Sequence, residues 1–344
     1  MTVLWAALAL ALPGDALAQT DPLLGQQWNL FMVESGAAHA LATGAGVTIA
    51  IIDTGIEASH PDLQGARFLQ GYDFVDDDPI PQDGNGHGTH VLGIAGATEA
   101  NGIGVASVAP GATILPVRVL GDDGTGDLGN VVRGIDYAVA RGADIINLSI
   151  GSEAPVEGTP GQFNAAIDRA LDAGRIVVGA AGNDGLPVCG QPSAEGRMLC
   201  VGAVDRRREH SSFSNYGVGL GLVAPGGSGQ PFSGENVPST YDGGYSERAG
   251  TSQAAPHVSG VAALLVQRGV RGQAAVRRIL ATAADVGSPG PDALYGAGVV
   301  NARLALTAPG APSPTQTTAA SQVVVSLARR ARIRTMLRRG IRVR

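Results

Sequence analysis

Short apolar runs rich in β-branched residues alternate along the chain with longer stretches in which apolar residues recur every three to four positions. The first pattern is typical of buried strands and the second of amphipathic helices. Strands are predicted at 47–53, 114–120, 143–150, 176–181, 200–204 and 220–224, and helices at 87–97, 128–141, 162–173, 252–268 and 272–284. Because the two kinds alternate, we expect an α/β fold, a three-layer sandwich with a mostly parallel, twisted sheet flanked by helices on both faces.

Composition favours one large domain. The chain has 344 residues, of which 44% are apolar, so it can bury a sizeable core. Aromatic residues make up only 4%, whereas glycine reaches 51 residues, which indicates close backbone packing rather than large aromatic clusters. No apolar run reaches the 18 or so residues of a membrane-spanning helix, so we expect no membrane span.

The N-terminal segment has the pattern of a secretory signal. An apolar stretch from Thr2 to Leu12 is followed by Ala16-Leu17-Ala18, which is similar to a signal-peptidase site. We therefore predict a signal peptide at 1–18 and a catalytic domain at 19–307. The alternative is an apolar leader left by a misplaced start codon.

The C-terminal segment differs in composition from the rest. Residues 308–322 are rich in Ala, Pro and Thr and predict a linker. Residues 323–344 carry eight arginines and no acidic residue, so the net charge of −6 on the whole chain leaves −14 on residues 1–322. This tail could bind an acidic surface such as nucleic acid or an anionic envelope; alternatively, it is a disordered basic end or the opening strands of a truncated module.

The two cysteines, Cys189 and Cys200, lie eleven positions apart. In a secreted chain this spacing fits a disulfide that closes a loop. Two buried free thiols are the alternative.

Three polar residues stand where parallel-sheet proteins place chemistry. Asp53 ends a predicted strand, His87 lies at the glycine-rich start of a helix, and Ser252 begins an apolar helix. Each has an ordinary structural explanation, since a strand-end aspartate or a serine at a helix start can be a cap. Their order along the chain, Asp, His, Ser, is that of the subtilisin type of catalytic triad.

The segments around these residues resemble the three signatures of the subtilase family. They are IIDTGI from Ile51 with HPDL from His60, GHGTHVLGIAG from Gly86, and GTSQAAPHVSG from Gly250. The resemblance covers about residues 21–306 and is greatest to thermitase-like members. It implies a serine endopeptidase that hydrolyses peptide bonds through a covalent acyl-enzyme.

The resemblance also implies residue roles. Ser252 would be the nucleophile, His87 the general base and Asp53 the residue that orients the imidazole, while the Asn183 side chain and the Ser252 backbone N–H would form the oxyanion hole. Substrate would add as a strand between two edges, and a pocket beside them would accept a large apolar P1 side chain with broad specificity. The edges and the pocket wall are Gly124, Thr125, Gly126, Ser149, Ile150, Gly151, Ala180, Ala181 and Gly182.

Two calcium sites are implied as well. The acidic segment 73–82 offers hard oxygen donors and no soft ligand for zinc, although its composition alone also fits a solvated loop. By resemblance, the ligands of this first site would be Asp73, Asp76, Asp78, Gln82 and the Ile80 carbonyl. Those of a second site would be Asp21, Asp62, Asn101 and the carbonyls of Ile103 and Val105.

The expected partners are polypeptide substrates, and we expect a secreted monomer whose catalytic domain binds no nucleic acid. The alternative is a catalytically silent subtilase fold that acts as a binding protein.

Relatives carry a propeptide ahead of the mature domain, whereas only 20 residues precede Asp21 here. Either the enzyme folds without a propeptide or the sequence begins inside a longer chain.

Overall fold

The computed structural model describes residues 20–151, 160–190, 198–231 and 233–309. The expected signal peptide at 1–18, the linker from residue 310 onward and the tail at 323–344 lie outside the described residues. Every element described below belongs to the first of two units of the chain, Met1–Ala308.

An eight-stranded sheet forms the centre of this unit. Its strand order is β2-β4-β1-β5-β6-β7-β8, with β3 also pairing with β4, and each of these pairs is parallel. The strands are β1 (Thr48–Asp53), β2 (Arg67–Phe68), β3 (Tyr72–Asp73), β4 (Thr113–Arg118), β5 (Ile145–Leu148), β6 (Ile176–Ala180), β7 (Leu199–Val204) and β8 (Leu220–Pro225).

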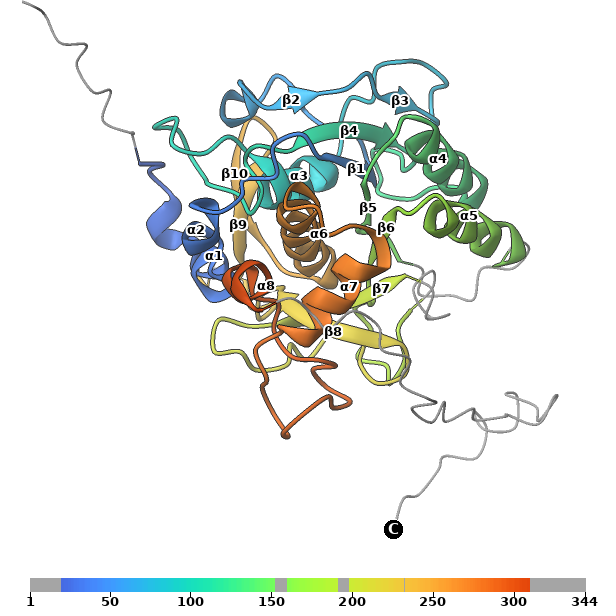
Figure 1. The fold of residues 1–344 in the computed structure, drawn as a ribbon. Helices are drawn as coiled ribbons and strands as arrows, with labels where there is room; N and C mark the ends of the chain where they lie inside the picture. The colour runs from blue at the N-terminus through green and yellow to red at the C-terminus, as the bar shows by residue number, and fades with distance from the viewer. Residues whose placement is uncertain (1–19, 152–159, 191–197, 232, 310–344) are drawn as a thin grey trace, which may run out of the picture. The chain divides into compact units, whose positions relative to one another are not determined.

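Helices cover both faces of the sheet (Figure 1). On β1, Ile49 and Ile51 pack into one core cluster with α3 and α6, whereas Ala50 and Ile52 pack into another with α4 and α5. Neighbouring strand residues point to opposite faces, so a strand buried on both faces must be apolar throughout. The helices are α3 (His87–Gly96), α4 (Leu128–Ala140), α5 (Pro160–Asp172), α6 (Thr251–Gln267) and α7 (Gly272–Ala281).

This architecture confirms the predicted α/β fold, and the six strands and five helices agree with the sequence to within a few residues. Several short elements were not expected. They are the short strands β2 and β3, two 3-10 turns (Leu24–Gln26 and Pro61–Leu63), the helices α1 (Trp28–Val33), α2 (Ser35–His39) and α8 (Ala302–Thr307), and the hairpin β9 (Val237–Tyr241) with β10 (Gly244–Arg248). Within the described part of the chain, no helix has the length and apolarity needed to cross a membrane.

The hairpin β9–β10 packs on α3. Its Ser239 hydroxyl donates to the His90 carbonyl at 2.7 Å, and the Thr240 hydroxyl donates to the Thr89 carbonyl at 2.8 Å. These bonds attach the hairpin to the helix that starts at His87.

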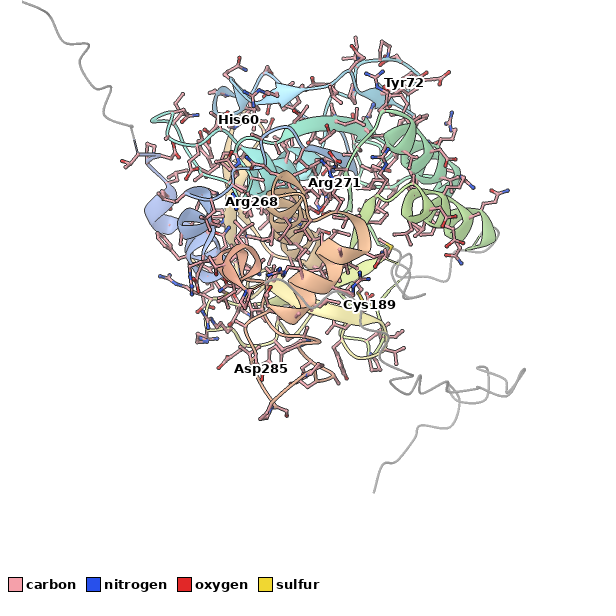
Figure 2. The ribbon with its side chains drawn as sticks, in the orientation of Figure 1. His60, Tyr72, Cys189, Arg268, Arg271 and Asp285 are labelled. Carbon is pink, nitrogen blue, oxygen red and sulfur yellow. A yellow bond between two sulfur atoms is a disulfide. The ribbon has the colours of Figure 1, made fainter. Side chains whose placement is uncertain are left out.

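Cys189 and Cys200 form a disulfide, the first of the two alternatives (Figure 2). Cys189 lies in the loop after β6, and the completely buried Cys200 lies in β7, which pairs with β6. The disulfide therefore ties this loop to the strand beside β6. A covalent link of this kind restricts the unfolded chain more than the folded one and thereby stabilises the fold.

The strand order places a topological switch point beside β1. From β1 the chain crosses to β4 on one side, and from β4 it returns to β5 on the other side of β1. Connections that leave in opposite directions open a crevice at the carboxyl ends of the strands, where open α/β sheets bind their ligands. Asp53 ends β1 at this crevice, and Ser149 directly follows β5.

Candidate active site

Asp53 and His87 are held together at this edge of the sheet. The Asp53 carboxylate is fully buried, and its Oδ1 accepts from the Thr54 backbone N–H at 2.8 Å and lies 2.7 Å from His87 Nδ1. The first residues of α3 can come this close because position 88 is glycine. A Cβ there would lie 2.1 Å from the Gly55 carbonyl oxygen, so no larger residue fits.

The environment of His87 favours its protonated form. Burial, the largest influence, lowers the pKa of His87, but the charge of Asp53 and its hydrogen bond outweigh burial, so the pKa is raised above its ordinary value. Asp83 raises it slightly, and Arg248 lowers it slightly. An imidazole whose protonated form is stabilised in this way can accept a proton readily from a neighbouring hydroxyl.

Asp83 organises the loop that leads into α3. Its Oδ1 accepts from the Thr54 hydroxyl and from the backbone N–H groups of Asn85 and Gly86, and its Oδ2 accepts from the N–H and hydroxyl of Thr89. Asp83 therefore caps the helix start and links it to the end of β1. Asp83 was not among the predicted site residues, although an aspartate shortly before a helix is a recognisable capping signal.

Ser252 is the second residue of α6, and Ser149 fixes it from the end of β5. The Ser252 hydroxyl donates to the Ser149 carbonyl at 2.9 Å, and the Ser149 hydroxyl donates to the Ser252 carbonyl at 2.8 Å. The second bond compensates for Pro256, which has no N–H to donate to the carbonyl four residues earlier. In this arrangement the Ser252 hydroxyl bonds Ser149 and not His87.

Asn183 follows β6 and is oriented by Thr251. Its Oδ1 accepts from the Thr251 backbone N–H at 2.9 Å and from the Thr251 hydroxyl at 3.0 Å. With its oxygen engaged, the amide leaves its nitrogen as a donor beside Ser252. The Thr251 hydroxyl also accepts from the Gly182 N–H at 3.1 Å, so one threonine ties the α6 start to the end of β6. Sequence reasoning did not single out Thr251.

The residues expected to bind substrate lie on two sides of Asp53. Gly124, Thr125 and Gly126 form an exposed loop after β4, in which the Thr125 carbonyl accepts from the Gly121 N–H at 2.8 Å. On the other side, Ser149 is buried, Ile150 half-buried and Gly151 exposed, and residues 152–159 lie outside the described residues. The expected pocket wall lies at the end of β6, where Ala180 and Ala181 are buried and Gly182 is half-buried.

The expected site at Asp21 and Asp62 has a donor set that suits calcium. Both carboxylates are buried, and Asn101 joins them, since its backbone N–H donates to Asp21 at 3.1 Å and its side-chain nitrogen donates to Asp62 at 2.9 Å. Burial, foremost, and the charge of Asp21 raise the pKa of Asp62. The backbone N–H groups of Ala100 and Val105 also donate to these carboxylates. Buried carboxylate oxygens are hard ligands of the kind that calcium prefers, and a bound cation would balance their charge.

The acidic loop at 73–82 fits a cation less well. The Arg118 guanidinium is buried and pairs with Asp73 at 2.6 Å and with Asp76 at 2.5 Å, so two expected ligands already have a cation as their partner. Asp78 accepts from the Ile80 N–H, and the Ile80 carbonyl accepts from the Gln82 N–H. Among the described residues, no group of three or more acidic, histidine or cysteine side chains is arranged to hold a metal ion. The sequence prediction did not include this arginine.

Comparison with known proteins decides the family. The family profile described as "Subtilase family" matches residues 44–298. The chain belongs to the subtilase family. Subtilisin BL of Lederbergia lenta is 41% identical to this subtilase over 282 residues, which cover 81% of the chain and 97% of that relative. Thermitase of Thermoactinomyces vulgaris is 39% identical over 288 residues, with coverage of 83% and 98%.

Solved structures give the same result. A protease of Pseudoalteromonas arctica is similar to this subtilase with a TM-score of 0.75 and 32% sequence identity, over 84% of this chain and 98% of that one. The family and its protease relatives show that this subtilase is a serine endopeptidase. They give no support to the alternative of a catalytically silent binding protein.

Proposed function

We propose that this endopeptidase works through Ser252, His87 and Asp53. The observation that carries the proposal is the 2.7 Å contact between Asp53 and His87 at the switch point of the sheet. The Ser252 hydroxyl leaves the Ser149 carbonyl, transfers its proton to His87 and attacks the peptide carbonyl. His87 then donates that proton to the leaving amine. Asp53 holds the imidazole in the tautomer that presents a basic nitrogen to Ser252.

The developing negative charge on the carbonyl oxygen would be stabilised by two donors, the Asn183 side-chain nitrogen and the Ser252 backbone N–H. Thr251 supports this role because it occupies the Asn183 oxygen and leaves the nitrogen free to donate. A single donor of this kind typically contributes about 3 kcal/mol to transition-state stabilisation, because it is already oriented before charge develops.

Substrate would bind in extended form between 124–126 and 149–151. Recognition of this kind relies on main-chain hydrogen bonds, so we expect specificity to be broad. The small residues Ala180, Ala181 and Gly182 leave space for a large apolar side chain at P1.

An ester substrate with a chromophoric leaving group tests the mechanism. Acylation of Ser252 should release a rapid burst of one chromophore per enzyme molecule, followed by slower turnover as the acyl-enzyme is hydrolysed. The burst is measured by stopped-flow absorbance. A second measurement covers the case in which acylation is the slower step: esters of one acid with different leaving groups should partition equally between water and added hydroxylamine, and unequal partition would contradict a common acyl-enzyme.

We also propose that Asp21, Asp62, Asn101 and the carbonyls of Ile103 and Val105 bind a structural calcium ion. The ion would neutralise the two buried carboxylates and tie the segment before α1 to the loop after α3. The donor chemistry described above supports this site. We propose no ion at 73–82, because Arg118 already pairs with two of the expected ligands there.

Chelation should then destabilise the enzyme. At a free calcium concentration one hundred times its Kd, bound calcium stabilises the fold by about 2.7 kcal/mol, which corresponds to a Tm shift of roughly 5 °C. The shift is measured by calorimetry on a Ser252→Ala background, which prevents self-cleavage. Asp62→Asn should abolish the calcium response, whereas Asp78→Asn in the other loop should retain it. Equal responses in the two variants would contradict the assignment.

We also propose that the enzyme is secreted and monomeric. The disulfide supports an oxidising compartment, and the apolar segment ahead of residue 19 supports export. Polypeptides are the substrates of the family, and we propose no nucleic-acid partner for the catalytic unit.

A further inference from the structure

Arg248 lies four residues before Ser252, and no carboxylate among the described residues pairs with its charge. It ends β10, and its guanidinium carbon lies 4.9 Å from the centre of the Tyr241 ring. Its Nη1 is sealed from solvent and bonds nothing, and within the described part of the chain the guanidinium has neither an ion pair nor a hydrogen bond. The residue as a whole is only half-buried, so the remainder of the group reaches the surface.

A guanidinium nitrogen that is sealed from water normally has a hydrogen-bond partner. The buried Arg118 of the same chain shows the usual solution, since three carboxylates surround it. Arg248 has only the face of an aromatic ring, which orients the guanidinium but leaves its hydrogen-bond donors unused.

The position of Arg248 shows where that anion would bind. Tyr241, on which Arg248 rests, lies against the segment that leads into His87: a Cβ on Gly86 would come within 2.3 Å of the Tyr241 ring, and the Tyr241 hydroxyl donates to the Asn85 carbonyl at 3.1 Å. The Arg248 charge also reaches the catalytic imidazole, because it lowers the pKa of His87. Through Tyr241, Arg248 is thus placed on the His87 side of the site.

We propose that Arg248 binds an acidic side chain at the first residue after the cleaved bond (P1′). This inference rests on the proposed function, in which His87 protonates the leaving amine and the leaving fragment therefore lies on the His87 side of Ser252. A glutamate or aspartate there would supply the acceptor that the guanidinium lacks. Arg248 would make the subtilase selective for acidic residues on the leaving-group side, while P1 selection stays apolar.

Quenched fluorescent peptides test this directly. Two peptides share one sequence and differ only in Glu or Gln at P1′, and a second pair differs in the same way at P3 on the acyl side. The readout is the ratio of kcat/KM for Glu over Gln, which does not depend on how much of each enzyme preparation is active. We expect a ratio of about ten at P1′ and about one at P3 for the wild type.

Arg248→Gln should bring the P1′ ratio to about one, and Arg248→Glu should bring it below one. The matched control is Arg206→Gln, which removes an exposed arginine outside the site and should keep the ratio near ten. A wild-type ratio near one, or a ratio that survives in Arg248→Gln, overturns the inference while the cleaved Gln peptide still supports the proposed function. If the folded wild type cleaved neither peptide, both this inference and the proposed function would be overturned.

Discussion

Replacing Ser252 with alanine is expected to lower the rate of peptide hydrolysis about a millionfold, the size of loss known for the nucleophile of subtilisin. The reason is that no other described group at the site is placed to form the acyl-enzyme. His87 and Asp53 remain in such a variant, but they have no hydroxyl to activate. The rate is measured as kcat on a peptide amide substrate, with the concentration of folded enzyme determined independently.

The matched control for this variant is Ser259→Ala in the same helix. Ser259 is fully buried, and its hydroxyl donates to Asn147 Oδ1 at 2.8 Å. Its loss should reduce stability by about 1 kcal/mol or more, because Asn147 loses a partner, while kcat changes by only a few fold. If Ser252→Ala retained more than a thousandth of wild-type activity, Ser252 would not be the nucleophile.

Replacing Asp53 with asparagine is expected to lower kcat about ten-thousandfold. Asparagine preserves the size of the side chain but can present an N–H to His87, which stabilises the tautomer that cannot accept the Ser252 proton. In the wild type, activity rises with pH as His87 loses its proton, and Asp53 moves this limb of the pH–rate profile toward higher pH because it raises the pKa of His87. Without that charge the limb should move to lower pH.

A pH–rate profile measures both effects of the Asp53 variant. The control is Asp127→Asn, which removes a charge from the exposed cap of α4, where an asparagine oxygen can still accept from the Gly129 N–H. It should leave the rate and the limb in place. A limb that moved to higher pH in Asp53→Asn would show that Asp53 does not stabilise the protonated imidazole.

The sequence predicted the central architecture because buried strands and amphipathic helices leave periodic patterns. The hairpin β9–β10 was missed even though Asp242-Gly243 is a turn signal, because its strands are short and begin near Pro238. The helices α1 and α2 were missed because each has only about one turn and Glu34 between them adopts a left-handed conformation.

Within the site, the three principal residues could be found because they lie in characteristic local segments. The roles of the residues that support them could not be predicted, because these residues act over long sequence separations. Ser149, which was expected only to bind substrate, compensates for Pro256, and Thr251 orients Asn183. Arg118 illustrates the same limit. Only the register of β3 against β4, which sets Asp73 beside Arg118, reveals that a cation from β4 pairs with the acidic loop.

The most direct test of the account is to label the enzyme with an active-site sulfonyl fluoride and locate the modified residue by peptide mass spectrometry. The proposed mechanism predicts one label per molecule, on Ser252, with loss of activity in proportion to labelling. Labelling should become much slower in His87→Ala, because the hydroxyl is then no longer activated. Complete inactivation with the label on any other residue would contradict Ser252 as the nucleophile.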